Sequence, residues 1–168
     1  LRSSPIEPPV LYELHYHLGS TYRQLQNPLE AEKHYIQAIA QPLSEQMKLG
    51  AYTNLGGLLQ EKGDLSNAEK LFQQVVQIDP TFAIGYFNLG LTLKAMGNLP
   101  GAVAHYRQAI QLNPSYADAY QNLGVALLKL GRIPQSLQAF QQAIDLHDAN
   151  GSPEAARLRQ GLQSMGLR

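Results

Sequence analysis

The triplet Asn-Leu-Gly recurs three times along this chain of 168 residues, at a constant spacing. It occupies residues 54–56, 88–90 and 122–124, so each copy lies 34 residues after the one before it. A weaker copy at residues 17–19 reads His-Leu-Gly and lies 37 residues before the first. A fixed period of this length is typical of proteins in which each repeat buries its apolar face only against its neighbours. The chain is therefore expected to fold as an array of similar units.

Each copy keeps the same order of large and small residues. An aromatic residue precedes each Leu-Gly pair, except in the first copy, where the residue is His15. A small residue, a ring and a second compact residue follow in phase, and two copies close with a proline. The columns are Tyr52, Tyr86 and Tyr120; Ala31, Ala68, Ala102 and Ser136; Tyr35, Phe72, Tyr106 and Phe140; Ala38, Val75, Ala109 and Ala143; Pro80 and Pro114.

Within each unit the apolar residues recur at steps of three and four, which predicts two amphipathic helices. The Gly and Ala columns would let these helices approach closely, and the aromatic columns would fill the space between them. A left-handed glycine followed by an N-cap residue is expected between the two helices. The glycines are Gly63, Gly97 and Gly131, and the expected caps are Asn27, Asp64 and Asn98.

This order of large, small and proline positions in a 34-residue unit resembles the tetratricopeptide repeat. The resemblance covers about residues 12–148 and implies an all-α fold, a right-handed α-solenoid of about four helix pairs plus a C-terminal capping helix. The sequence departs from the family pattern at His15, at Gln26, where other copies have glycine, and at Asp148, where the closing proline is missing.

The expected organisation follows from the repeat register. A Pro-rich leader or linker covers 1–11, four repeats cover 12–48, 49–82, 83–116 and 117–150, and a capping helix covers 151–168. Residues 41–48 include three extra residues, which are expected to lengthen the first helix of the second pair towards its N-terminus.

Charge and composition favour neither nucleic-acid nor membrane binding. Lys and Arg balance Asp and Glu at 13 against 13, and no basic run is present. Without cysteine there is no thiolate metal site and no thiol nucleophile. The sequence also has no phosphate-binding glycine motif, no nucleophile elbow and no metal ligands at suitable spacing. No enzyme activity, cofactor or metal is therefore expected.

The five histidines do not suggest a metal site. His15 and His17 would point about 200° apart on a helix and could not share a metal ion. His15 stands in a core aromatic column and is expected to be packed and hydrogen-bonded. The other three, His34, His105 and His147, fall on second helices and are expected to face solvent.

The first helix of each pair is expected to line a concave groove, where a partner would bind. One asparagine per repeat projects there, namely Asn54, Asn88 and Asn122. An amide both donates and accepts, so this ladder could hold an extended peptide backbone. The resemblance implies the same role, because a comparable ladder contacts peptides in some superhelical arrays of the family, such as that of the O-linked N-acetylglucosamine transferase. The alternative is that these asparagines cap or bridge neighbouring helices.

Four apolar side chains are expected to leave a patch on the groove of the third and fourth repeats, which favours a partner site. The alternative is that another helix, or the leader, covers them. These residues are Ile84, Phe87, Leu91 and Val125. The predicted peptide-binding set is completed by Tyr16, His17 and Lys94.

The sequence thus predicts a protein–protein interaction module that binds a peptide or helical segment of a partner, in scaffolding, assembly or recruitment. The chaperone-tail clamp of Lys, Asn and Arg found in part of the family is not expected, because none of its places holds a cationic residue. In the first-repeat register these places hold Tyr16, Ser20, Asn54, Ile84 and Asn88. One alternative is the substrate-recruiting arm of a larger enzyme, since the chain begins with Leu1 rather than Met. Another is a structural protein that forms a homo-oligomer through an imperfect end cap.

Overall fold

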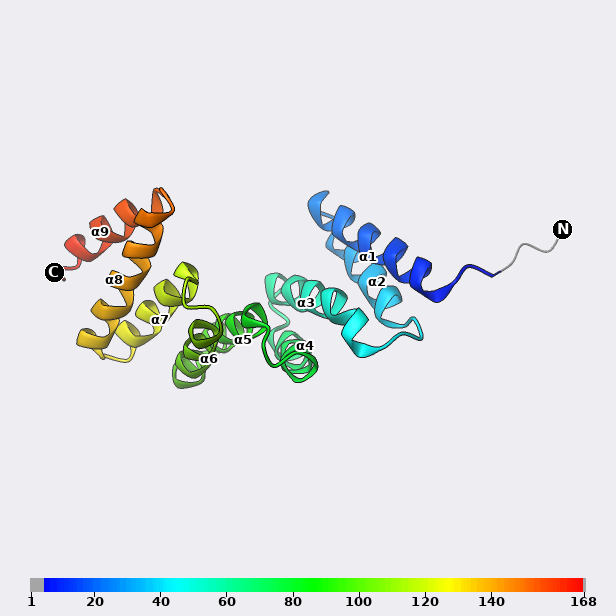
Figure 1. Ribbon diagram of the computed structural model, residues 1–168, viewed down its shortest axis with the longest axis horizontal. Coiled ribbons are helices and arrows are strands. Elements are labelled where there is room, and N and C mark those ends of the chain that lie inside the picture. The colour runs from blue at the N-terminus through cyan, green and yellow to red at the C-terminus, as the bar shows by residue number, and fades with distance from the viewer. Residues whose placement is uncertain (1–4, 168) are drawn as a thin grey trace. The chain divides into compact units, whose positions relative to one another are not determined.

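The computed structural model describes residues 5–167, and in this range the chain is helical with no strand (Figure 1). It divides into two compact units, Leu1–Pro80 (unit 1) and Thr81–Arg168 (unit 2). Each unit contains two consecutive helix pairs, and unit 2 ends with a further helix. The predicted all-α fold of repeated helix pairs with a C-terminal helix is confirmed. No helix in the described range is both long and apolar enough to cross a membrane.

The helices follow the repeat register. Unit 1 contains α1 (Pro8–Gln24), α2 (Pro28–Ile39), α3 (Glu45–Glu61) and α4 (Leu65–Ile78). Unit 2 contains α5 (Ala83–Ala95), α6 (Leu99–Leu112), α7 (Ala117–Lys129), α8 (Ile133–Ala149) and α9 (Glu154–Ser164). Because α1 begins at Pro8, residues 8–11 of the predicted leader are helical, and residues 1–4 lie outside the described range.

The expected N-caps are present in three of the second helices. The side chains of Asn27, Asp64 and Asn98 each accept a hydrogen bond from the backbone N–H three residues later. The Asn98 bond, to the N–H of Gly101, is 3.0 Å long. Such caps satisfy one of the backbone donors that a helix start leaves without an intrahelical partner.

The turn before each capped or proline-led second helix requires a left-handed residue. Gly63, Gly97 and Gly131 have φ values of 81°, 83° and 73°. In the first repeat the same place holds Gln26 at φ 57°, the one non-glycine residue with positive φ in the described range. A side chain in this conformation costs about 1–2 kcal/mol, so the first turn keeps its shape against a local strain.

The extra residues at 41–48 lengthen α3, the first helix of the second pair, as predicted. The helix α3 has 17 residues, whereas α5 and α7 have 13 each. Its first turn is fixed by Glu45, whose carboxylate accepts hydrogen bonds from Tyr52 Oη at 2.6 Å and from Gln74 Nε2 of α4 at 3.1 Å. These bonds tie the added turn to the body of unit 1.

Within each pair, the glycine of the first helix faces the ring of the second. The ring column Tyr35, Phe72, Tyr106 and Phe140 is almost entirely buried. A Cβ atom at Gly90 would lie 2.5 Å from Tyr106 Cε1, well inside van der Waals contact. The two columns therefore meet face to face, as the repeat pattern predicts.

The core of unit 2 is continuous across its two helix pairs. It consists of Leu93, Ala102, Val103, Tyr106, Leu123, Ala126, Leu127 and Ala139, which come from α5, α6, α7 and α8. The helix α9 packs on α8 and buries Ala155. It lies where a terminal cap is expected, because the last pair of a repeat array must cover its outer apolar face.

Candidate functional site

The inner face of each unit is formed by first helices. In unit 1 α1 contacts α3, and in unit 2 α5 contacts α7. The backbones of the second helices α2 and α4, like those of α6 and α8, do not approach each other closely. A pair of repeats with this contact pattern is narrower on the side of its first helices, which therefore form its concave face. The predicted binding residues all lie on these first helices.

Lys94 and Asn122 join the inner faces of α5 and α7. Lys94 Nζ donates to Asn122 Oδ1 at 2.5 Å, and Asn122 Nδ2 donates to the backbone oxygen of Asp118 at 2.9 Å. The amide of Asn122 is thus used at both ends. This arrangement matches the alternative in which an asparagine of the ladder bridges neighbouring helices.

Lys94 is half-buried, and the pKa of its ammonium lies below the usual value. The larger cause is burial, which removes water from the charged form, and the second is repulsion from Lys129 on α7. The inner face of unit 2 therefore carries two lysines close enough to repel each other.

Asn54 and Asn88 differ from Asn122. Both are half-buried. Neither side chain forms a hydrogen bond with a described residue of its own unit. Asn54 lines a pocket of about 310 Å³ together with Ser20, Arg23, Gln24 and Tyr35. A free amide at the wall of such a pocket can offer both a donor and an acceptor to a peptide bond.

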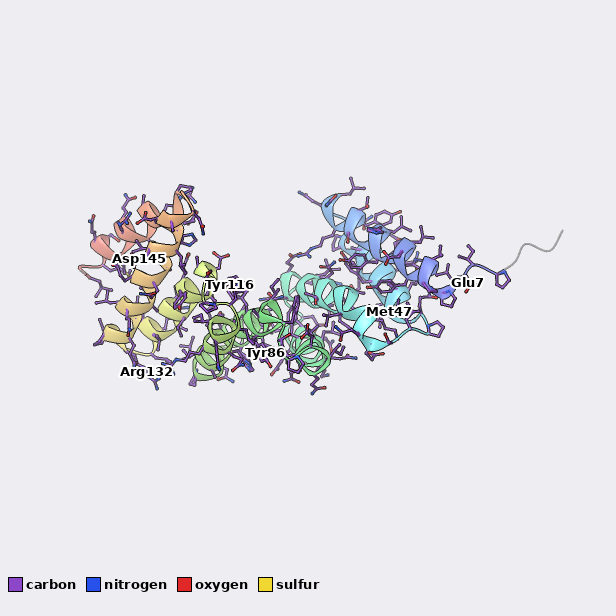
Figure 2. All side chains as sticks on the ribbon, viewed as in Figure 1. Glu7, Met47, Tyr86, Tyr116, Arg132 and Asp145 are labelled. Atoms are coloured by element: carbon purple, nitrogen blue, oxygen red, sulfur yellow. The ribbon has the colours of Figure 1, made fainter. Side chains whose placement is uncertain are left out.

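The predicted apolar patch on unit 2 is largely used in packing. The Phe87 ring packs at a tilt against the Tyr116 ring with centroids 4.8 Å apart, and both Phe87 and Leu91 pack against the unit 2 core (Figure 2 shows Tyr116 at the start of α7). Val125 is half-buried, and only Ile84 is exposed, at 44%. The face thus offers one exposed apolar side chain rather than a patch of four.

On the inner face of unit 1, Tyr16 and His17 have different surroundings. Tyr16 stacks on Tyr12 with centroids 5.8 Å apart and packs beside Ala51 of α3, so much of its ring serves the core. His17 is exposed, and its Nε2 lies 3.3 Å from a carboxylate oxygen of Glu13. Of these two, His17 has the side chain that a ligand could reach.

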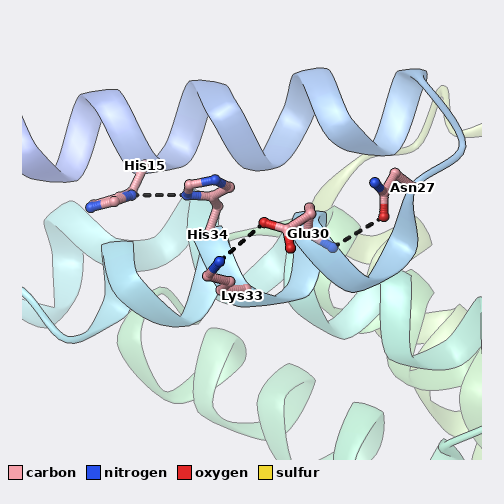
Figure 3. Close-up of polar contacts among 5 residues, drawn as sticks. All are labelled: His15, Asn27, Glu30, Lys33 and His34. Carbon is pink, nitrogen blue, oxygen red and sulfur yellow. Dashed lines mark hydrogen bonds and ion pairs between the residues drawn. The ribbon is translucent and has the colours of Figure 1, made fainter.

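His15 packs in the aromatic column, as predicted, and forms a pair with His34. Figure 3 shows the two rings between α1 and α2, with Nδ1 to Nδ1 at 3.0 Å. The His34 ring also stacks on Tyr22 at 5.3 Å. The prediction that His34 faces solvent is wrong, because the neighbouring helix supplies two rings that half-bury it.

The prediction is also wrong for the two histidines of unit 2. His147 is 7% exposed on α8, the helix that α9 packs against, and His105 is half-buried and stacks on Tyr86. No three His, Asp or Glu side chains gather at metal-binding distance within the described residues.

Acidification is expected to destabilise unit 1 through His15. Burial, and then the nearby His34, lower the pKa of His15 below its usual value. As the pH falls through about 6.5, His15 in the unfolded chain therefore binds a proton before His15 in the folded chain does. The stability that unit 1 gains from an uncharged His15 is complete above that pH, and it is lost as the pH falls towards the lower pKa of His15 in the folded chain.

The measurement is urea unfolding at about pH 7.5 and about pH 5.5. The midpoint of the parent should fall further on acidification than that of His15→Tyr, which carries the residue type of the other repeats. His17→Gln, which changes an exposed histidine, should respond to pH like the parent. An equal fall in His15→Tyr and the parent would contradict the assignment.

Family models match the chain along most of its length. A model described as TPR repeat matches residues 56–97 and 92–131, and models described as tetratricopeptide repeat match 12–41 and 117–150. The chain belongs to the tetratricopeptide repeat family. A search of curated proteins returned no match.

Solved structures with the tetratricopeptide fold agree. A crystal structure of MamA has a TM-score of 0.76 and 23% identity, and the alignment covers 83% of this chain and 80% of that one. YrrB, described as a TPR protein with an unusual peptide-binding site, has a TM-score of 0.71 and 21% identity. The alignment covers 82% of this chain and 69% of YrrB. The TPR2B domain of yeast Sti1, in a complex with pHsp70, has a TM-score of 0.65 and 24% identity. The alignment covers 68% of this chain and 92% of that domain. At these identities the likeness shows the fold alone.

Tetratricopeptide columns alone do not reveal two polar pairs on the inner faces. Arg23 of α1 pairs with Glu61 of α3, and Lys94 of α5 lies near Lys129 of α7. The apolar columns predict how helices pack, whereas these pairs depend on residues at the ends of first helices that the repeat does not fix. The signal that could have found them is their common register, four and five residues after the glycine column.

Proposed function

We propose that this chain is a protein–protein interaction module whose concave inner faces bind an extended or helical segment of a partner protein. The observation that carries the proposal is that Asn54 and Asn88 present amides on the inner faces without a hydrogen bond inside their own units. A peptide backbone needs a donor and an acceptor at each residue, and an amide supplies both. Ile84 adds exposed apolar surface beside Asn88.

The three asparagines have different roles in this proposal. Asn54 contacts a bound segment on the inner face of unit 1 and Asn88 does so on the inner face of unit 2, while Asn122 holds the ammonium group of Lys94. His17 and Lys94 add polar contacts, and Tyr16, Phe87, Leu91 and Val125 form the wall behind them. The four repeats at 12–48, 49–82, 83–116 and 117–150 are the proposed structural units of this module.

The related structures support this kind of function. YrrB is described as having a peptide-binding site, and the TPR2B domain of Sti1 as part of a complex with pHsp70. Both share the fold with this chain. Binding of a protein segment by first helices is therefore compatible with the scaffold, although the ligand chemistry must come from the side chains of this chain.

The proposal is tested by selecting binders from a random peptide library and titrating them calorimetrically. We expect micromolar peptides, and the Asn54→Ala/Asn88→Ala double variant should weaken them about tenfold, because each lost hydrogen bond is worth about 0.5–1.5 kcal/mol. Asn150→Ala, at the exposed end of α8, is the matched control and should bind like the parent. Failure to select any peptide, or equal binding by the double variant and the control, would contradict the proposal.

A further inference from the structure

Both units place a charged pair at the C-terminal ends of their first helices, and the two pairs occupy the same register. In unit 1, Arg23 lies four residues after Gly19, and Glu61 lies five after Gly56. In unit 2 the same offsets from Gly90 and Gly124 lead to Lys94 and Lys129. The register is shared, but the charges are not.

In unit 1 the pair is complete. A guanidinium nitrogen of Arg23 forms an ion pair with a carboxylate oxygen of Glu61, which joins α1 to α3. The added Cβ position at Gly57 lies 3.5 Å from the same guanidinium, so the Arg23 side chain lies along the inner face. Here the chain itself supplies the anion for the cation.

In unit 2 the described residues do not supply such an anion. Neither Lys94 nor Lys129 forms an ion pair with any acidic residue among the described residues of this unit. Lys94 instead binds the neutral oxygen of Asn122, and its pKa is lowered by burial and by Lys129. A half-buried ammonium beside a second, exposed lysine is stabilised when an opposite charge joins the pair.

The nearest acidic residue along α7 cannot fill this place. Asp118 stands at the start of the helix and Lys129 at its end, about 16 Å away along the axis. The charge of Asp118 acts on Tyr116, whose pKa is raised to about 12 by burial first and then by that carboxylate. Asp118 therefore belongs to the opposite end of the inner face.

The wider charge distribution points the same way. Residues 81–168 contain seven Lys and Arg against four Asp and Glu, whereas residues 1–80 contain six against nine. The neutral total thus conceals a positive second half. A positive field around the lysine pair would attract an acidic ligand and disfavour a basic one.

We propose that Lys94 and Lys129 bind a glutamate or aspartate side chain in an acidic segment of the partner protein, which supplies the negative charge that Glu61 supplies in unit 1. This inference rests on the proposed function and adds the chemistry of the segment. Asn122 positions the Lys94 ammonium, since its own amide is anchored to the backbone of α7. The lysines lie further along the first helices than Ile84 and Asn88, where the chaperone-tail clamp would have its contacts.

The test uses the whole chain and a fluorescein-labelled peptide that carries a run of glutamates between Gly and Ser residues, with an amidated C-terminus. The matched peptide has glutamines in the same places. In anisotropy titrations at about 20 mM salt, we expect the glutamate peptide to bind at least about tenfold more tightly than the glutamine peptide. Lys94→Gln and Lys129→Gln should each weaken it about threefold or more, and Lys129→Glu about tenfold or more.

Two controls separate a site from general positive charge. Arg107→Gln removes one exposed charge from α6, a second helix, and should bind like the parent. Lys129→Glu should melt at or above the temperature of the parent, because it recreates the charge pattern of Arg23 and Glu61. Lost binding in that variant then reflects a filled site and not a damaged fold.

Several outcomes would overturn the inference. These are no binding of the glutamate peptide, equal binding of the glutamine peptide, unchanged binding by the lysine variants, or an equal loss in Arg107→Gln. A single-stranded oligonucleotide that binds more tightly than the peptide through the same lysines would assign the site to nucleic acid instead. If selected library peptides depend on Asn88 but not on Lys94, the proposed function stands and this inference fails.

Discussion

Replacing Tyr106 by alanine is expected to lower the free energy of unfolding by about 3–5 kcal/mol, the usual cost of deleting a large buried ring. The ring is fully buried in unit 2, where it faces Gly90 and lies 5.9 Å from the ring of Phe87. It belongs to the core that joins α5, α6 and α7. Its loss would leave a cavity at the centre of the unit, which close-packed neighbours could fill only in part.

Removing only the hydroxyl group of Tyr106 is expected not to destabilise the chain. Tyr106 Oη is buried with no hydrogen-bond partner among the described residues, and burial raises the pKa of the phenol. Tyr106→Phe removes this oxygen and should leave stability unchanged or raise it by up to about 1 kcal/mol. The equivalent residues Phe72 and Phe140 already lack the hydroxyl.

Tyr35 provides the matched comparison. Its hydroxyl donates to Ser20 Oγ at 3.3 Å, so Tyr35→Phe should cost about 0.5–1.5 kcal/mol. All three variants are compared by urea unfolding followed by circular dichroism. A loss below about 1 kcal/mol for Tyr106→Ala, or a larger loss for Tyr106→Phe than for Tyr35→Phe, would contradict this account of the ring column.

The ring column also explains why the fold could be predicted from one sequence. A single apolar position is compatible with many folds, but here each position is supported by its copies. The contact between Gly90 and Tyr106 follows from columns that recur as Gly56 with Phe72 and Gly124 with Phe140. The N-caps and turn glycines follow in the same way, since each copy repeats the backbone geometry of the others.

The candidate site was less predictable because a repeat pattern defines faces and not individual partners. Helical spacing places Phe87 and Leu91 opposite the buried face, but Tyr116 and the neighbouring core pack against them. His147 is buried on the helix that α9 packs against, and no column of the repeat describes α9.

The partners of a polar residue such as Asn122 could not be predicted from the repeat pattern either. It stands in phase with Asn54 and Asn88, yet its amide is used by Lys94 and by its own helix. Such differences arise where one repeat carries a side chain that the others lack. Predicting them therefore requires the positions of atoms, because the register of the repeat columns is the same in every copy.

Replacing Gly90 by alanine gives the second large effect, a net loss of up to about 2 kcal/mol in spite of the better helix propensity of alanine. Alanine should gain about 1 kcal/mol within a helix, but overpacking a filled core costs about 1–3 kcal/mol or more. The new methyl group would lie 2.5 and 2.6 Å from two carbons of the Tyr106 ring, which has no free space into which to move. The whole helix α5 must therefore shift away from α6.

Substitution of a second glycine separates the gain in helix propensity from the cost of overpacking. Gly161 lies in α9, and an added Cβ there meets no atom within 4 Å. Gly161→Ala should therefore show the propensity gain alone, about 0.5–1 kcal/mol, in the same urea experiment. If Gly90→Ala also stabilises the chain, the approach of α5 to α6 is looser than the packing of Tyr106 implies. If Gly90→Ala destabilises while Gly161→Ala stabilises, the glycine column is retained because the ring opposite it leaves no room for a methyl group.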